Sequence, residues 1–321
     1  MHSFEELSKE FLTKFSSRHF PVQPASLYDA ADYFLGIGGK RIRPVMCLMG
    51  NELFDEIIPD AYSVATAIEL FHNFTLIHDD IMDKAPLRRG MPTVHEKYNS
   101  STALLAGDVM LVIAYDYINK IETPHLHRVI HLFNKTAKQV CEGQQLDMEF
   151  EEKKQVLLND YLHMIELKTS VLLAASLRLG AILGGASEGN QDHLYEFGKN
   201  LGLAFQVQDD YLDAFGDPAK FGKQVGGDII ANKKTFLLVK AMELATAKQR
   251  EEMNGLIQQN SADKIRKMLA VFRACGVDEA AKSAKEKYLE IALQHLEDIA
   301  VLSKRKESLK ELAQFLIQRD Y

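Results

Sequence analysis

Apolar residues recur at intervals of three and four along most of this chain. Residues 62–82 show the pattern clearly, with Val64, Ile68 and Phe71 in one run and Leu76 in the next. This spacing places the apolar side chains on one face of an α-helix. Runs that alternate between apolar and polar residues, which would predict strands, do not occur between the turn signals. The pattern therefore predicts an all-α protein.

The same helical period continues toward the end of the chain. It runs through residues 194–215 and through a Lys- and Glu-rich segment from Asp263 to Gln318. The chain has eight prolines, and most of them flank the helical segments. No low-complexity linker divides the chain, so the sequence predicts a single domain over residues 1–321.

Composition and charge narrow the classes of function. The 321 residues are 46% hydrophobic and 26% charged, which is ordinary for a globular protein with a large core. The net charge of -7 disfavours a general nucleic-acid binder, which would usually be basic. Any anionic ligand must therefore bind to local clusters of basic residues.

Cysteine usage and apolar runs bear on location. Cys47, Cys141 and Cys275 lie far apart without a CxxC pair, so we expect a cytoplasmic protein in a reducing environment. The charged N-terminal segment lacks the apolar core of a secretory signal. We expect no stable membrane insertion, because no uninterrupted apolar stretch reaches membrane-spanning length. Residues 169–186 come nearest, but Arg178 interrupts them, and they are typical of a buried helix.

Two acidic motifs carry the candidate chemistry. Residues 78–83 read HDDIMD and residues 208–213 read QDDYLD, each near the end of a long apolar helix. In each motif the first and last aspartates share one face of the helix, whereas the middle one lies on the flank. Hard oxygen ligands at this spacing suit Mg²⁺, which usually binds one or two carboxylates together with phosphate oxygens. The six carboxylates are Asp79, Asp80, Asp83, Asp209, Asp210 and Asp213.

A solvated acidic face is the alternative for either motif taken alone. Both copies, however, lie among core residues, as in FHNFTLIHDDIM and GLAFQVQDDYL. Burying unpaired carboxylates is costly, and like charges one helical turn apart repel each other. A bound divalent cation removes both costs, so the two motifs together favour a metal site.

Basic residues occur in four places that suit phosphate binding. In GIGGKRIRP the glycines let backbone N–H groups approach an anion where a helix begins. LRRG follows the first acidic motif, ELKTS puts a lysine in an apolar helix, and FGKQVGGDIIANKKT follows the second motif. Solvated bases in a turn or a surface loop are the alternative for the first and last of these. The bases are Lys40, Arg41, Arg43, Arg88, Arg89, Lys168, Lys223, Lys233 and Lys234.

Two neutral side chains share a helical face with the acidic motifs. His72 precedes Asp79 by seven residues, and Gln206 precedes Asp209 by three. A lone histidine on a helix is often only a core residue, and both interpretations stay open for His72. Gln206 is a candidate donor to a phosphate or to a substrate.

In this order, the motifs resemble those of the polyprenyl synthetase family of trans-isoprenyl diphosphate synthases. The resemblance covers almost the whole chain, through GGKRIRP, HDDIMD with RRG, FQVQDDYLD, and GK followed by GGD and KKT. It also includes Gly107–Asp108, Glu142–Gln144 and Lys168–Thr169. It implies a helical bundle around a central cavity, usually a homodimer, in which the two acidic helices face each other.

The resemblance also implies a reaction. Three Mg²⁺ ions help an allylic diphosphate to ionise, and isopentenyl diphosphate attacks the resulting cation before a proton is lost. Asp79 and Asp83 would bind two ions and Asp209 the third, whereas the other three aspartates would be ligands or would support them. The implied ligands of the allylic diphosphate are Arg88, Lys168, Gln206, Lys223 and Lys233. Those of isopentenyl diphosphate are Lys40, Arg43, His72 and Arg89, and Thr169 would steady the cation with Gln206.

Product length depends, by the same resemblance, on residues just before the first acidic motif. Phe74 and Thr75 lie five and four residues before Asp79. One aromatic residue there resembles short-chain synthases that make geranylgeranyl diphosphate, and farnesyl diphosphate is nearly as well matched. In the alternative, Phe74 packs in the core and the tunnel ends deeper. The candidates for that deeper floor are Met110, Val112 and Ile113.

Other functions share parts of this pattern, and a synthase of longer polyprenyl chains is the nearest. A terpene cyclase usually has one DDxxD and a different second metal motif. A catalytically silent partner of a synthase tends to lose one acidic cluster, whereas both are intact here. The chain departs from the family at Asn232 and Leu237, where Gly and Pro are common, and in its less basic end, QRDY.

Overall fold

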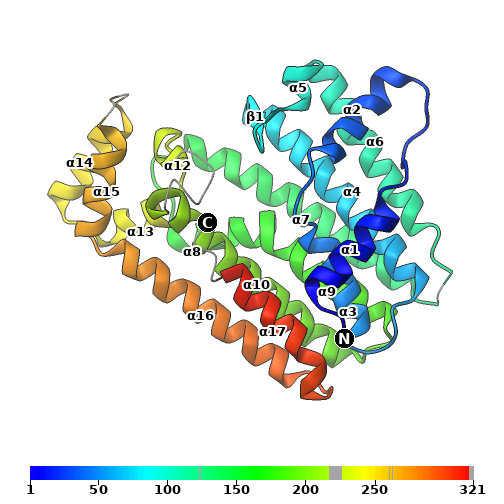
Figure 1. Cartoon of the computed structure of the whole chain (residues 1–321). Coiled ribbons are helices and arrows are strands. Elements are labelled where there is room, and N and C mark those ends of the chain that lie inside the picture. Colours follow the sequence, from blue (N-terminus) through cyan, green and yellow to red (C-terminus); the bar gives the residue numbers. More distant parts are fainter. Residues whose placement is uncertain (123, 217–225, 260, 262, 318–321) are drawn as a thin grey trace. The chain divides into compact units, whose positions relative to one another are not determined.

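The structure is a computed structural model that describes residues 1–321 except 123, 217–225, 260, 262 and 318–321. Within these residues it is helical apart from one short hairpin, which confirms the predicted all-α fold (Figure 1). The chain divides into two compact units. The single domain and the opposition of the two acidic helices stay predictions.

The first unit comprises Met1–Asn134, Ala175–Leu194 and Ala300–Ser308. In it α4 packs against α3 and α6, and the predicted apolar face of α4 is buried at Val64 and Ile68. The elements wholly within this unit are α1 (Phe4–Phe15), α2 (Ala25–Gly36), α3 (Ile42–Glu52), α4 (Pro59–Met82), β1 (Leu87–Arg88), β2 (Met91–Pro92), α5 (Val94–Lys97) and α6 (Ser100–Ile118).

The second unit comprises Lys135–Ala174, Tyr195–Ile299 and Leu309–Tyr321. Its core contains Tyr161 and Phe236, and α13 packs against α8, α15 and α16. The elements wholly within it are α8 (Leu158–Ile165), the π-helical turn η1 (Glu166–Ser170), α12 (Gly227–Ile230), α13 (Phe236–Leu244), α14 (Ala247–Ile257), α15 (Lys264–Ala274) and α16 (Val277–Asp298). Four helices contribute residues to both units: α7 (Leu126–Glu152), α9 (Val171–Leu183), α10 (Glu188–Phe215) and α17 (Ser303–Ile317).

Local sequence explains where the acidic motifs fall. Pro59 occupies the first turn of α4, where its missing N–H costs no hydrogen bond. The helix ends at Met82 with Asp83 as its C-cap, so the first motif occupies its last turn. The second motif likewise lies near the end of α10, which stops at Phe215. Both motifs therefore stand at helix ends followed by loops.

One helix of the first unit, α6, is long and apolar enough to cross a membrane by length and composition alone. Residues 169–186, which the sequence analysis placed nearest to this length, contain one charged residue, Arg178, whereas α6 contains Asp108 and Asp116. They fall mainly on η1 and the 13-residue α9, and most of them are buried, as predicted for a buried helix. A single helix of this kind is weak evidence for a span, because a core helix of a globular protein passes the same test. Only a third of α6 is buried, and its outer face includes the exposed side chains of Leu104, Leu105 and Val112.

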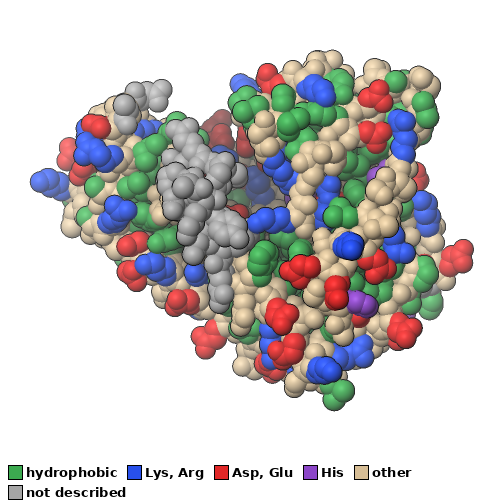
Figure 2. All heavy atoms as spheres, in the orientation of Figure 1, with side chains coloured by type: hydrophobic (Ala, Val, Ile, Leu, Met, Phe, Trp, Pro, Cys, Tyr) green, Lys and Arg blue, Asp and Glu red, His purple; other side chains and the backbone are tan. Residues whose placement is uncertain are grey.

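Charged side chains are mixed over the surface. Figure 2 shows Lys and Arg side chains interspersed with Asp and Glu side chains on the visible face. Both signs of charge are therefore present across this face.

Candidate active site

The three aspartates of the first motif have different surroundings. Asp79 is partly exposed and Asp83 exposed, whereas Asp80 on the flank is only 2% exposed. This is the division that helical geometry predicts for residues one turn apart and for the residue between them. Asp79 and Asp83 thus provide two oxygen-donor groups on one face of α4.

A tight hairpin brings two arginines back to this helix end. Strands β1 and β2 pair antiparallel, and the turn residues Arg89 and Gly90 both have left-handed backbones, with φ of 51° and 77°. Two such residues form the turn whose twist matches paired strands. Arg88 donates from Nε and Nη2 to Asp80 at 2.7–2.9 Å, and its Nη2 lies 3.7 Å from Asp79.

This ion pair explains how Asp80 tolerates its buried position. Burial raises the pKa of the Asp80 carboxyl, and the hydrogen bonds from Arg88 oppose that rise. A bidentate guanidinium is the strongest side-chain partner for a carboxylate. The oxygens of Asp80 are therefore engaged by protein, and the pair connects the hairpin to the acidic motif.

The glycine-rich turn before α3 meets the same hairpin. Gly39 has φ of 153°, and a Cβ on it would lie 2.8 Å from Arg89 Nη1. This backbone conformation favours glycine, and any side chain at position 39 would also displace the end of Arg89. Lys40 follows it, exposed. Two predicted groups that are distant in sequence, the GGKRIRP turn and the RRG loop, thus come together in the first unit.

His72 joins this basic group. Its Nε2 lies 3.0 Å from Arg43 Nη1, and because arginine only donates, the ring nitrogen accepts. Burial, followed by the nearby charges of Arg43, Arg88 and Arg89, lowers the pKa of His72 well below its usual range. Burial also lowers the pKa of Arg43 to about 10, which leaves it protonated at neutral pH. His72 is a neutral acceptor that orients an arginine.

Arg41, next to Arg43 in sequence, has a different role. Its guanidinium pairs with the buried Glu69 and donates to the Leu35 carbonyl at 3.0 Å. Asn73 also donates to Glu69 Oε1 at 2.8 Å, so this buried carboxylate has two side-chain partners. The sequence placed Arg41 among the phosphate-binding candidates, but the structure uses its charge to balance a buried carboxylate.

In the second unit a π-helical turn presents the KT pair. A Cβ on Gly143 would lie 2.2 Å from Lys168 N, so α7 can approach this turn only with glycine there. Lys168 Nζ lies 2.6 Å from Asp147 Oδ2, and Thr169 Oγ1 donates to Gln206 Oε1 at 3.4 Å. Single π-helical turns are frequent at functional sites. The structure thus brings together Lys168, Thr169 and Gln206 as predicted from sequence.

Asp147 is a partner that the sequence analysis did not identify. It follows Gly143 by four residues on α7, so both lie on the face that meets Lys168. The helical spacing from the EGQ motif was the signal that could have found it.

The middle aspartate of the second motif is held by neutral donors. Asp210 is 5% exposed and accepts from Tyr161 Oη at 2.5 Å, Phe236 N at 2.7 Å and Gln206 Nε2 at 3.1 Å. Burial raises the pKa of Asp210 to about 7, although these hydrogen bonds favour the ionised form. Through it α8, α10 and the N-terminus of α13 are joined.

Gly226 and Asp228 of the GGD motif contact Asp213 of the second motif. Its Oδ2 accepts from Asp228 N at 3.1 Å, and its carbonyl accepts from Gly226 N at 2.6 Å. The GGD motif therefore begins α12 against the acidic motif. Lys223 lies outside the described residues. Lys233 follows α12, and its backbone N–H bonds the Asp228 carbonyl.

Two of the three departures from the family pattern have local explanations, and the third, QRDY, lies outside the described residues. Asn232 has φ of 57°, a left-handed conformation that glycine adopts freely and asparagine adopts better than most residues. Its Oδ1 accepts from the buried Lys264 at 2.7 Å. Leu237 is buried in the first turn of α13, where a proline is also tolerated.

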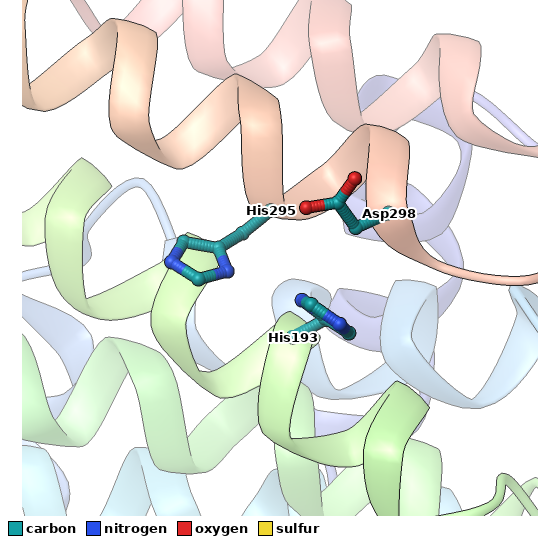
Figure 3. Close-up of side chains that lie close together, drawn as sticks. All are labelled: His193, His295 and Asp298. Atoms are coloured by element: carbon teal, nitrogen blue, oxygen red, sulfur yellow. The ribbon is translucent and has the colours of Figure 1, made fainter.

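One further acidic and histidine group lies away from these motifs. Figure 3 shows His295 and Asp298 on α16, three residues apart and therefore on one face, and His193 on α10. His193 belongs to the first unit, whereas His295 and Asp298 belong to the second. Because these three residues belong to different units, they are not treated as one site.

The fold and the side chains define a class of protein. It is all-helical, and each unit presents carboxylates beside cationic side chains. The donor set fits a divalent ion, because Asp79 and Asp83 offer hard oxygens one turn apart and Asp80 is held by Arg88. Arginines and lysines of this kind suit phosphate groups. Such a set of side chains is typical of helical proteins that bind phosphate groups together with a divalent metal ion.

The comparisons with known proteins give the family. The family model described as "Polyprenyl synthetase" matches residues 24–273. A short chain isoprenyl diphosphate synthase of Methanothermobacter thermautotrophicus is 36% identical over 94% of this chain and 92% of its own. A geranylfarnesyl diphosphate synthase of Natronomonas pharaonis is 35% identical over 98% of this chain and 96% of its own. The chain belongs to the polyprenyl synthetase family and is an isoprenyl diphosphate synthase, a trans-prenyltransferase.

Solved structures agree. A geranylgeranyl pyrophosphate synthase superposes with a TM-score of 0.94 at 41% identity, covering 99% of both chains. A polyprenyl synthase from Caulobacter crescentus CB15, at 25% identity and a TM-score of 0.89 over 99% of this chain and 97% of its own, was solved with calcium and isoprenyl diphosphate. Members of this family therefore bind divalent metal ions.

Proposed function

We propose that this protein condenses isopentenyl diphosphate with an allylic diphosphate, head to tail and in the trans configuration, to give geranylgeranyl or farnesyl diphosphate. The observation that carries the proposal is the end of α4, where paired carboxylates meet the arginines of the hairpin. Carboxylates for a divalent ion and guanidinium groups for phosphate oxygens are what a leaving diphosphate requires.

The first step is ionisation of the allylic diphosphate. Asp79 and Asp83 would hold two Mg²⁺ ions and Asp209 a third, and the bound ions would supply positive charge that stabilises the leaving group. Asp80, Asp210 and Asp213 support these ligands through the contacts described above. The remaining ligands of this diphosphate are Arg88, Lys168, Gln206, Lys223 and Lys233.

Isopentenyl diphosphate is bound by the basic group of the first unit. Lys40, Arg43 and Arg89 supply its positive charge, and neutral His72 orients Arg43. Thr169 and Gln206 present oxygens that steady the allylic cation. The double bond attacks this cation, and the departed diphosphate takes the proton that is lost. Water must be excluded meanwhile, because it would trap the cation.

Product length is set at Phe74 in this proposal. The Phe74 ring is only partly buried, which supports a place on a tunnel wall. Thr75 beside it donates to the His72 carbonyl at 2.8 Å. Of the deeper candidates, Met110 is fully buried and Val112 is 59% exposed. The geranylfarnesyl diphosphate synthase among the relatives makes a longer product the second candidate.

Incubation with Mg²⁺, isopentenyl diphosphate and each of several allylic starters, followed by product mass analysis, tests the proposal. We expect diphosphate release and a C20 or C15 product. A longer main product would favour the second candidate, and no diphosphate release would favour a catalytically silent partner. Phe74→Ala should lengthen the product because it removes bulk from the tunnel. An unchanged product would place the floor elsewhere.

The working protein is, in this proposal, a cytoplasmic single-domain homodimer. The family match spans residues of both units, which supports one domain. The outer face of α6 supports the dimer, because Leu104, Leu105 and Val112 are 49%, 55% and 59% exposed. A second copy would cover this apolar face. Light scattering should give twice the chain mass, and Leu105→Glu should give the monomer; an unchanged dimer would place the interface elsewhere.

A further inference from the structure

His78 immediately precedes the first acidic motif, and it crosses to the neighbouring helix. Its Nε2 lies 3.0 Å from the Leu104 carbonyl of α6. A carbonyl only accepts, so the imidazole donates from Nε2. Asp108 Oδ1 lies 3.7 Å from the same nitrogen. The His78 side chain is only 15% exposed, which leaves it little freedom.

Gly107 makes this crossing possible. A Cβ on Gly107 would lie 2.4 Å from His78 Nε2 and 2.5 Å from Cδ2, closer than atoms approach without displacement. The imidazole therefore occupies the volume that any other residue at position 107 would fill. Both residues of the GD motif, Gly107 and Asp108, are contacts of His78.

His78 also contacts the residue that we assign to product length. The Phe74 and His78 rings are one helical turn apart on α4, with centroids 4.8 Å apart at an interplanar angle of 69°. Such edge-to-face contacts stabilise one relative orientation of two rings. On its other side the Phe74 ring contacts that of Phe71, with centroids 5.6 Å apart. The Phe71 ring in turn contacts that of Phe133 on α7, with centroids 5.4 Å apart.

We propose that His78 is a positioning residue that fixes the ring of Phe74, through its contacts with Gly107 and Leu104 of α6, and so determines product length. This inference rests on the proposed function, in which Phe74 limits the tunnel. The two neighbours of the Phe74 ring are held in place differently. Phe71 is buried in the core, whereas His78 is held by one hydrogen bond to Leu104 and by its contact with Gly107. Loss of the contact with His78 frees the Phe74 ring to turn aside.

Three variants test the proposal by product mass analysis with a fixed allylic starter. His78→Ala removes both the ring and the hydrogen bond, and Gly107→Ala adds one methyl group where the imidazole lies. We expect each to raise the ratio of longer to normal product by about tenfold, the discrimination that a small change in an apolar pocket gives. His78→Gln retains a donor that can reach the Leu104 carbonyl, so its product ratio should fall between those of the wild type and His78→Ala.

A double variant separates positioning from general damage. If His78 acts through Phe74, adding His78→Ala to Phe74→Ala should lengthen the product no further than Phe74→Ala alone. His19→Gln is the matched control, because His19 also bonds a backbone carbonyl, that of Phe15 at 2.9 Å, within the same unit. It should leave the product ratio unchanged.

The outcomes distinguish this inference from the proposed function. If Phe74→Ala lengthens the product but His78→Gln and Gly107→Ala only lower kcat, the inference is overturned and the proposed function stands. Additive lengthening in the double variant would also overturn it. If Phe74→Ala itself changes nothing, the tunnel assignment fails, and this inference fails with it. His78→Gln is the mildest change and stays measurable if the alanine variant does not fold.

Discussion

The two acidic motifs have nearly the same sequence, yet their middle aspartates have different partners. Asp80 on α4 is paired with the guanidinium of Arg88, which carries a positive charge into the motif. Asp210 on α10 is surrounded by a backbone N–H, a phenol and an amide, none of them charged. The first motif is thus paired with an arginine that we propose binds phosphate, and the second contributes to the packing of three helices.

The difference shows that two copies of the same motif can contribute unequally to activity and to stability. Arg88 holds Asp80 and also lies 3.7 Å from Asp79, so a change at Arg88 would directly affect a proposed metal ligand. Asp210 instead closes a buried network around the first turn of α13, where the orphan N–H of Phe236 requires an acceptor. We expect loss of the first network to lower activity and loss of the second to lower stability.

The largest effect is expected for the first aspartate of each motif, and it tests whether Asp79 and Asp209 contribute equally to catalysis. Asp79→Asn should lower kcat by about 10²–10³-fold with little change in Tm, because charge stabilisation of the leaving group is lost. Asp209→Asn should lose a similar factor. Steady-state kinetics and thermal unfolding check both. A loss of less than tenfold in either would mean that this aspartate is not a metal ligand.

The next effect concerns the middle aspartate of the second motif. Asp210→Ala leaves the buried donors of Tyr161 and Phe236, and the partly buried amide of Gln206, without this acceptor. It should lower the free energy of unfolding by about 2–4 kcal/mol. Urea unfolding followed by circular dichroism measures it. Asp210→Asn is the matched control, since its amide oxygen still accepts. Stability equal to the wild type in the alanine variant would contradict the network.

A smaller loss of stability is expected at the first motif. Asp80→Asn leaves Arg88 with a neutral partner, but Arg88 is 22% exposed and can turn to water, so we expect about 1–2 kcal/mol. The same variant should raise the KM for the allylic diphosphate, because Arg88 is no longer held in place. A lower KM, or a loss of stability exceeding that of Asp210→Ala, would reverse the comparison.

The smallest effect is a pH dependence from His72. Its pKa is lowered well below 6.5 in the folded protein, so below that pH the unfolded chain binds a proton that the folded one does not. Stability should therefore fall as pH drops below 6.5, by at most about 1.4 kcal/mol per pH unit from this group. His72→Gln should weaken that dependence. An identical slope in variant and wild type between pH 7 and pH 5 would contradict a neutral His72.

The sequence by itself determined the helices and the residue types of the site. A period of 3.6 is local information, so the spacing of Asp79 and Asp83, and the exclusion of Asp80 from their face, could be predicted without any tertiary contact. Tight turns are equally local, which is why the RRG loop could be assigned to the end of the first motif. The order of motifs along the chain was enough to identify the family.

Only the tertiary structure decided which charges are partners. Arg41 and Arg43 are two residues apart and look equivalent in sequence, but one is neutralised by Glu69 and the other meets His72. The pairing of Lys168 with Asp147, and the contact of His78 with Gly107, likewise join separate helices. The physical reason is that a charge's energy depends on its distance from partners and from water, and that distance is fixed by packing rather than by sequence spacing.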